Sequence, residues 1–324
     1  MTEPVKEAGV DGPARDLVGY GRRPPHGTWP NGAKVALNIA LNIEEGSERS
    51  WAFGDRRNEG LGEVPRTVDA AYRDLATESV YEYGSRAGVF RLLRLFDRLG
   101  VKATMFAAAQ ALERNREAAS WIADAGHDVC CHGYRWAEQW TMAPGEEQEL
   151  IDLAVASITE TTGSRPLGWY SRWMASSRTR ELLAAEGGFV YDSDAYNDDI
   201  PYYAPAAGRS HLVLPYSQTY NDSFYSYGHI ASPSDFVDYC MRGLDYLRRE
   251  GDGVPRMMSV GLHARLSGQA ARTSAIEEFL EHALSLDDVW VTRRVDIAEH
   301  WLREFPARLS RDADGRPAAA AGRG

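Results

Sequence analysis

Three shortages in this sequence of 324 residues limit what the protein can be. It contains only three cysteines, and none has the C-x-x-C spacing of a thiolate zinc site, so neither that site nor a disulfide framework is expected. No apolar run approaches the roughly 20 residues that cross a membrane. The 36 basic residues are outnumbered by 47 acidic ones, and the net charge of −11 argues against nucleic acid as a partner, because phosphate binding needs a basic face.

The amino terminus also lacks the apolar segment of a secretory signal, which predicts a cytoplasmic protein. Residues 1–18 are polar, and residues 306–324 are rich in Arg, Ala and Gly, so both ends are predicted to be flexible tails. No break in composition divides residues 19–305. This stretch is therefore interpreted as a single domain. Hydrophobic and charged residues make up 44% and 26% of the whole sequence, which is ordinary for a globular protein.

Strand and helix patterns alternate about seven times along this domain. Strands are expected at 34–43, 101–106, 128–131, 167–170, 189–192, 257–262 and 289–292. Helices are expected at 85–99, 110–125, 145–162, 177–186, 234–250, 271–286 and 295–304. Such alternation produces parallel strands joined by right-handed crossovers, so the predicted fold class is α/β, a distorted barrel of seven or eight β/α units. Residues 47–80 and 195–232 lack helical periodicity and are expected to be long loops, with one candidate strand at 211–215.

Polar side chains follow several of the predicted strands. In a parallel barrel the carboxyl ends of the strands meet at one mouth. The residues placed there are Glu44, Glu45, His132, Trp169, Tyr170, Arg172, Asp192, Asp194 and His263. Each alone has a structural explanation, such as a solvated strand end for the glutamates or a satisfied core histidine for His263. Their gathering at one mouth favours a hydrolytic site.

The chemistry of such a set is amide hydrolysis. A carboxylate beside another carboxylate has a raised pKa and can act as a general base on water. A histidine on the opposite side can protonate the leaving nitrogen. A metal ion, or donors such as Tyr, Arg or protonated His, can hold the oxyanion.

Eight stretches carry a resemblance to a known family. They are Tyr20-Gly21-Arg22 with Pro24-Pro25, Leu41-Asn42-Ile43-Glu44-Glu45-Gly46, Glu78-Ser79-Val80-Tyr81-Glu82-Tyr83-Gly84-Ser85-Arg86-Ala87-Gly88, His132-Gly133-Tyr134-Arg135-Trp136, Gly168-Trp169-Tyr170, Tyr191-Asp192-Ser193-Asp194, Met258-Ser259-Val260-Gly261-Leu262-His263 and Asp296-Ile297-Ala298. Together they resemble the polysaccharide deacetylase (NodB homology) superfamily, and within it the allantoinase-like branch. The resemblance implies a barrel of the glycoside hydrolase and deacetylase type that hydrolyses carbon–nitrogen bonds other than peptide bonds.

The same resemblance implies roles for individual residues. Glu44 and Glu45 take the place of the family's paired aspartates, of which one is the base and the next a metal ligand. His132 matches the first His of the family's H-x-x-x-H metal motif, and His263 matches the general acid. The residues expected to contact substrate are Trp136, Trp169, Tyr170, Arg172, Asp192 and Asp194.

The metal motif is incomplete, because Trp136 stands where its second His would be. Glu45 and His132 then supply two ligands, whereas catalytic zinc usually has three protein ligands. Either a third ligand, Glu138 or Asp194, is recruited, or the metal is absent. The allantoinase-like branch implies a weakly held divalent metal, zinc if any, or none.

The leading prediction is a hydrolase that opens a cyclic ureide or imide such as allantoin with base-activated water. The alternatives are an N-deacetylase or deformylase acting on an amino sugar or a secondary metabolite, and a barrel that only binds a small ligand. Residues 171–179 depart from the branch's pattern, which indicates either a different substrate or neutral loop drift. The expected partners are a small-molecule substrate, without nucleic acid or membrane, and further copies of the chain. The resemblance implies a homotetramer, and the aromatic-rich segments 51–83 and 196–230 are its candidate interfaces.

Overall fold

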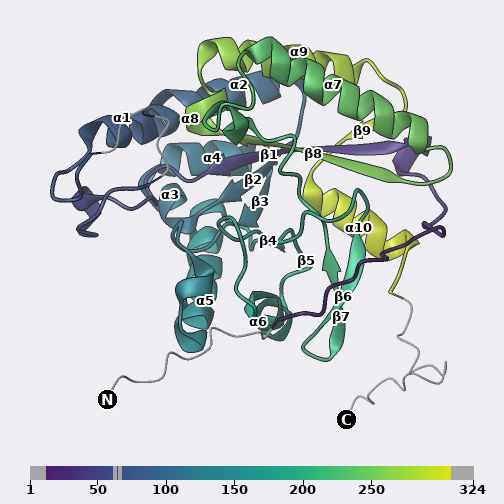
Figure 1. Ribbon diagram of the computed structural model, residues 1–324, viewed down its shortest axis with the longest axis horizontal. Helices are drawn as coiled ribbons and strands as arrows, with labels where there is room; N and C mark the ends of the chain where they lie inside the picture. The colour runs from purple at the N-terminus through teal and green to yellow at the C-terminus, as the bar shows by residue number, and fades with distance from the viewer. Residues whose placement is uncertain (1–11, 61–63, 65–67, 308–324) are drawn as a thin grey trace.

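The computed structural model describes residues 12–60, 64 and 68–307 (Figure 1). The predicted tails at 1–18 and 306–324 lie largely outside this range. The strands are β1 (Val35–Ile43), β2 (Thr104–Ala107), β3 (Asp128–Cys131), β4 (Gly168–Trp169), β5 (Tyr191–Asp192), β6 (Tyr202–Ala206), β7 (Arg209–Val213), β8 (Arg256–His263) and β9 (Val289–Val291). They form one sheet in the order β6-β7-β5-β4-β3-β2-β1-β8, with β9 beside β1. The sheet curls into the distorted (β/α) barrel that the sequence predicted.

Ten α-helices are described around this sheet. They are α1 (Leu75–Tyr83), α2 (Val89–Leu99), α3 (Ala109–Arg114), α4 (Arg116–Asp124), α5 (Pro144–Thr162), α6 (Thr179–Glu186), α7 (Pro233–Glu250), α8 (Ala264–Ser267), α9 (Ala270–Leu284) and α10 (Arg294–Glu304). Helices α2, α7 and α9 form a layer over β1 and β8 (Figure 1). In the part of the chain that the structure describes, no helix combines the length and the apolar character that a membrane span requires.

The two faces of β1 have different neighbours, because alternate residues of a strand point to opposite sides. The large residues Val35, Leu37, Ile39, Leu41 and Ile43 join the core between sheet and helices. The small residues Ala36 and Ala40 instead face the barrel interior. The neighbouring cysteines Cys130 and Cys131 divide in the same way, one into each core, and both are free and buried, as predicted.

One end of the barrel is closed by α10. This helix contributes Ile297 and Trp301 to the interior cluster, and the N–H of Arg294 at its start donates to Oγ1 of Thr104, the first residue of β2. Chemistry is thereby confined to the opposite end, where the strands finish. The barrel is also open along its side, since residues 214–222 reach β8 through a single bridge between Asn221 and Gly261. An open cleft of about 330 Å³ lies beside this segment.

Two predicted loops contain regular structure. Residues 75–83 form α1, which continues through a π-helical turn, Gly84–Gly88, into α2, so the helix predicted at 85–99 begins ten residues earlier. The periodicity of α1 was weak because only Thr77 and Tyr81 are buried. Within 195–232, β6 pairs antiparallel with β7. The sequence did not predict β6, because most of its residues are partly exposed and Pro205 lies within it.

The helix predicted at 110–125 is divided. Asn115 ends α3, and its side chain accepts a hydrogen bond from the Ala118 N–H to cap the start of α4. The remaining predicted strands and helices lie within a few residues of their expected ends.

Candidate active site

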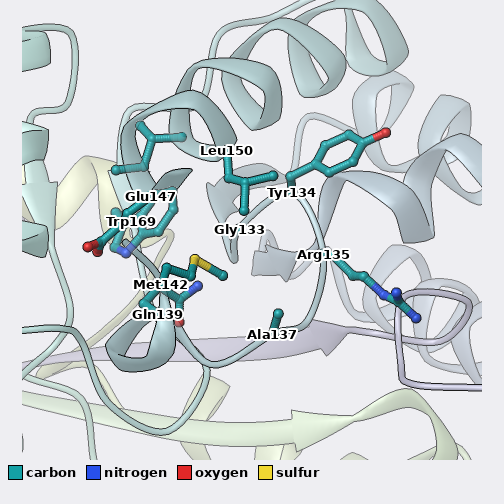
Figure 2. A pocket seen from close by; sticks show the side chains of 10 residues that line it. Gly133, Tyr134, Arg135, Ala137, Gln139, Met142, Glu147, Leu150 and Trp169 are labelled. Carbon is teal, nitrogen blue, oxygen red and sulfur yellow. The ribbon is translucent and has the colours of Figure 1, made fainter. Parts of the chain in front are cut away.

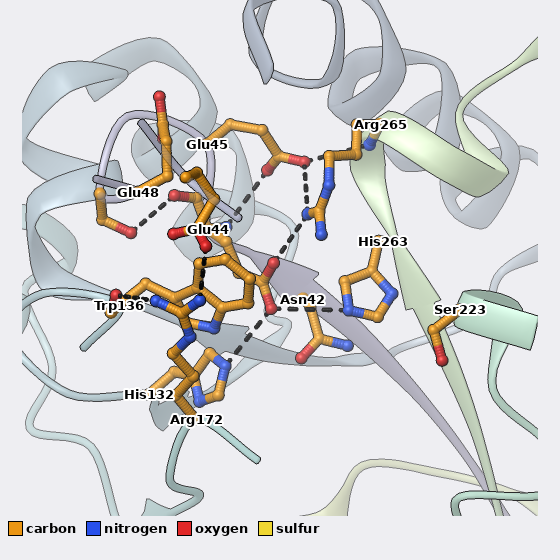
Figure 3. A network of polar contacts seen from close by, with 12 residues as sticks. Asn42, Glu44, Glu45, Glu48, His132, Trp136, Arg172, Ser223, His263 and Arg265 are labelled. Carbon is orange, nitrogen blue, oxygen red and sulfur yellow. Dashed lines mark hydrogen bonds and ion pairs between the residues drawn. The ribbon is translucent and has the colours of Figure 1, made fainter. Parts of the chain in front are cut away.

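Glu44 lies at the centre of the polar groups at the barrel mouth (Figure 3). Its Oε1 is 3.4 Å from Nε2 of His132 and 3.5 Å from Nε2 of His263, and its Oε2 accepts a 2.7 Å hydrogen bond from Nη1 of Arg265. Glu44 follows β1, His132 follows β3, and His263 ends β8. The structure therefore brings together three of the four predicted catalytic side chains and adds Arg265, from α8.

The electrostatic surroundings keep Glu44 ionised. Burial alone would raise the pKa of its carboxyl, but the positive charges of Arg265 and His263 and the hydrogen bond from His132 hold that pKa well below its usual range. At neutral pH the group is consequently a carboxylate that can accept a proton.

The buried carboxylate of Asp222 holds His263 in place. Asp222 does not directly follow any of the strands predicted from the sequence. Nδ1 of His263 lies 2.6 Å from Oδ1 of Asp222, and the backbone N–H of His263 donates to Oδ2 of Asp222 at 2.8 Å. Oγ of Ser267 donates to the same Oδ2 at 2.6 Å. Burial lowers the pKa of His263, but Glu44 and Asp222 raise it to about 10. The ring is then protonated, with Nδ1–H on Asp222 and Nε2–H directed toward Glu44.

His132 is oriented by the strand beside its own. Its Nδ1 lies 2.6 Å from the carbonyl oxygen of Tyr170, and its ring stacks on the Tyr170 ring with the centres 5.0 Å apart. A carbonyl can only accept a hydrogen bond, so Nδ1 carries the proton and Nε2 faces Glu44. Gly133 has a φ of 86°, which lets the chain turn away immediately after the histidine, as the sequence predicted.

Glu45 has a different environment from Glu44. Its Oε2 accepts from the N–H of Glu44 at 3.2 Å, and its Oε1 accepts from the N–H of Arg265 at 3.1 Å. Burial raises the pKa of Glu45, the charge of Arg265 lowers it, and Glu44 raises it further, with a net upward shift. These backbone bonds hold Glu45 as a fixed acceptor beside Glu44, and the raised pKa expected for one of two adjacent carboxylates is found at Glu45 rather than at Glu44.

The π-helical turn explains the motif from Tyr81 to Gly88. A Cβ added at Gly84 would lie 2.6 Å from Oε1 of Glu45, and one at Gly88 would lie 2.0 Å from the carbonyl oxygen of Ala264. Only glycine leaves room for the backbone to pack against Glu45 and α8. Such turns often occur at functional sites.

Trp136 and Arg172 form a wall next to these groups. The guanidinium carbon of Arg172 lies 3.7 Å from the centre of the Trp136 ring, which corresponds to a cation–π contact. Arg172 also donates to the carbonyl oxygen of Trp136 at 2.9 Å and to Oε1 of Glu59 at 2.7 Å. Both predicted substrate-contacting residues are thus close to the site, with Glu59 neutralising the charge of the arginine.

Among the predicted metal ligands Glu45, His132 and Glu138, Glu138 has protein partners of its own. Glu138 pairs with Arg49 at 3.3 Å and lies 3.6 Å from Nη1 of Arg172. Over the residues that the structure describes, no cluster of three or more His, Cys, Asp or Glu is arranged to hold a metal ion. The side chains present do not fit a catalytic metal, because Trp136 offers no ligand atom and a guanidinium faces the two glutamates.

Trp169 supports the loop that carries His132. It lines a small void of about 20 Å³ beneath residues 133–142 (Figure 2), and its Nε1 donates to Oγ of Ser171 at 2.9 Å. Tyr170 instead faces the barrel interior, where its hydroxyl lies 2.9 Å from that of Tyr196.

The predicted substrate contacts Asp192 and Asp194 have protein partners. Asp192 accepts from Nε of Arg180 at 2.6 Å and lies 3.2 Å from Nε2 of His211. Asp194 accepts from the N–H and Oγ of Ser171 at 2.7 and 2.8 Å. Burial and the charge of Asp192 raise the pKa of Asp194 to about 7. The two aspartates organise the turn that leads to Arg172.

Comparisons with known proteins agree with this geometry. The family model described as polysaccharide deacetylase matches residues 76–189. A Schizosaccharomyces pombe protein described as a polysaccharide deacetylase is 35% identical over 317 residues, which cover 90% of this chain and 98% of that protein. Two crystal structures, a probable polysaccharide deacetylase from Pseudomonas aeruginosa PAO1 and Puue allantoinase, share 46% and 44% identity and a TM-score of 0.86 each. Both matches cover 90% of this chain, together with 99% and 98% of the respective relatives. The chain belongs to the polysaccharide deacetylase family and is an amidohydrolase of carbon–nitrogen bonds other than peptide bonds.

Proposed function

We propose that the protein opens a cyclic ureide or imide by hydrolysis, with allantoin as the first compound to test. The observation that carries the proposal is the Glu44 carboxylate, held between His132 and a protonated His263. The 44% identity with Puue allantoinase over nearly the whole chain supports this substrate class.

The reaction follows from the proton positions. Glu44 takes a proton from water, and the water oxygen attacks the ring carbonyl carbon. Nε2 of His132 lies 3.4 Å from Oε1 of Glu44 and helps to position this water beside the carboxylate. The Nε2–H of His263 then protonates the ring nitrogen as the carbon–nitrogen bond breaks. The products are a carboxyl group at the former carbonyl and an N–H at the former ring nitrogen.

The burial of the site favours a small substrate. Glu44 and His132 are each 1% exposed and His263 is 9% exposed. A compact ring can be enclosed by such side chains, as small-molecule sites commonly enclose their ligands. A polysaccharide chain would need an extended groove across the same groups. The enclosed site therefore favours ring opening over the deacetylation of a polymer.

The test is a substrate panel of cyclic ureides, cyclic imides, N-acetyl amino sugars and N-formyl compounds, each with and without added divalent metal. The expected result is ring opening of a ureide or imide, with turnover that collapses in His263→Ala. Release of acetate or formate without ring opening would favour the deacetylase or deformylase alternative. Binding of a ligand without turnover of any compound would favour a non-catalytic barrel.

A further inference from the structure

Arg265 is the positively charged residue nearest to Glu44 that no predicted motif contains. It lies in α8, the short helix directly after β8, and its side chain is almost fully buried. Its Nη1 is 2.7 Å from Oε2 of Glu44 and 3.5 Å from Oε1 of Glu45 (Figure 3). One guanidinium thus compensates two adjacent buried carboxylates.

Aromatic side chains hold this guanidinium in place. Its carbon lies 4.6 Å from the centre of the Tyr81 ring and 5.6 Å from the centre of the Trp136 ring. Trp136 stands where the metal motif would have its second His. At this position the chain has the Trp136 ring in place of a metal ligand, and the guanidinium of Arg265 packs against that ring.

We propose that Arg265 is the resident cation of this site and takes over the electrostatic role that a divalent metal has in metal-dependent relatives. It acts through Glu44, which it holds in place and keeps charged, and is therefore a positioning residue. Its effect on turnover rests on the proposed function. Its effect on metal binding does not.

Loss of the Arg265 side chain should change metal binding, which can be measured without a substrate. Removal of the guanidinium leaves Glu44 and Glu45 beside the space that the arginine side chain filled, with Nε2 of His132 3.4 Å from Oε1 of Glu44. Two carboxylates and an imidazole are ligands that zinc accepts. Arg265→Ala is consequently expected to gain a site for a divalent cation.

A matched control exists outside the site. Arg248 also joins two carboxylates, with Nε 2.6 Å from Asp288 and Nη1 3.1 Å from Asp245, and His282 lies 3.6 Å from Asp245. This cluster also combines an arginine with two carboxylates and an imidazole, although its acids are aspartates, and it is much more exposed. Arg248→Ala therefore measures the zinc that an ordinary surface cluster of this composition would bind.

The experiment titrates chelator-treated full-length protein with Zn²⁺ by calorimetry. Arg265→Ala is expected to bind one equivalent at least tenfold more tightly than either the wild type or Arg248→Ala. In turnover, Arg265→Ala should lose kcat by roughly 10²- to 10³-fold with KM changed less than about threefold, as for the loss of a preorganised charge. Guanidinium chloride at millimolar concentration should restore part of this loss, whereas NaCl at equal ionic strength should not. Arg265→Lys should retain more activity than Arg265→Ala.

The proposal is overturned if Arg265→Ala keeps kcat within threefold of the wild type, or if its zinc affinity equals that of Arg248→Ala. Should Arg265→Ala not fold, Arg265→Gln, which keeps a hydrogen-bond donor without the charge, decides in its place by the same two readouts. Failure of the proposed function looks different. The wild type would then turn over no compound of the panel, while the zinc titration would still test the role of Arg265.

Discussion

The contact between Asp222 and His263 allows a quantitative prediction. Asp222→Asn keeps the size of the side chain but removes the negative charge 2.6 Å from Nδ1 of His263. Burial of the ring lowers the pKa of His263, but the carboxylates of Glu44 and Asp222 outweigh this effect and raise the pKa to about 10. Loss of one nearby opposite charge moves a pKa by about 1 to 3 units, so the variant should titrate between about pH 7 and 9.

The size of the shift sets the expected rate. One unit corresponds to about 1.4 kcal/mol, so the lost interaction is about 1.4 to 4 kcal/mol. At pH 9, a group with a pKa of about 10 is about 91% protonated, whereas one shifted down by two units is about 9% protonated, so the general acid is depleted about tenfold. Because this pKa is raised on folding, its stabilising effect is full below about pH 6.5 and is lost as the pH rises through 10. Asp222→Asn should reduce this contribution of His263 to the free energy of unfolding.

The assay is the dependence of kcat/KM on pH between 6 and 11, together with a histidine titration by NMR. The alkaline limb should lie near pH 10 in the wild type and near pH 7 to 9 in Asp222→Asn. Asp128→Asn is the control, since Asp128 is equally an interior carboxyl but lies at the start of β3, at the closed end of the barrel. An alkaline limb in Asp222→Asn within half a unit of the wild type would refute this account of His263.

Three further predictions concern single side chains. Glu44→Gln should lower kcat by about 10²- to 10⁴-fold because the base is lost, and steady-state kinetics that show less than a tenfold loss would exclude Glu44 as the base. Gly84→Ala should destabilise the fold by about 1 to 3 kcal/mol, because its Cβ would lie 2.6 Å from Glu45, and thermal unfolding at an unchanged temperature would contradict this. Arg172→Met should cost about 3 to 5 kcal/mol in urea unfolding, because buried Glu59 loses its guanidinium partner, and a neutral result would show that Glu59 is satisfied by other groups.

The sequence alone determined the class of fold and the centre of the site. Alternating strand and helix patterns imply parallel strands, and parallel strands place their carboxyl ends at one mouth. For that reason Glu44, His132 and His263 were placed together although more than 200 residues separate the first from the last. Each of these three residues lies at the end of a strand that is predicted from the residues directly before it in the sequence.

Only the tertiary structure decided what surrounds these groups. Asp222 reaches His263 because residues 214–222 cross the open side of the barrel, and no local pattern encodes that path. Arg265 reaches Glu44 and Glu45 because the chain turns into α8 directly after His263. Ion pairs between distant segments depend on register and on the side-chain space left after packing, and neither can be read from periodicity. The charge of the site, and with it the contact of Arg265 with both glutamates, therefore became visible only in three dimensions.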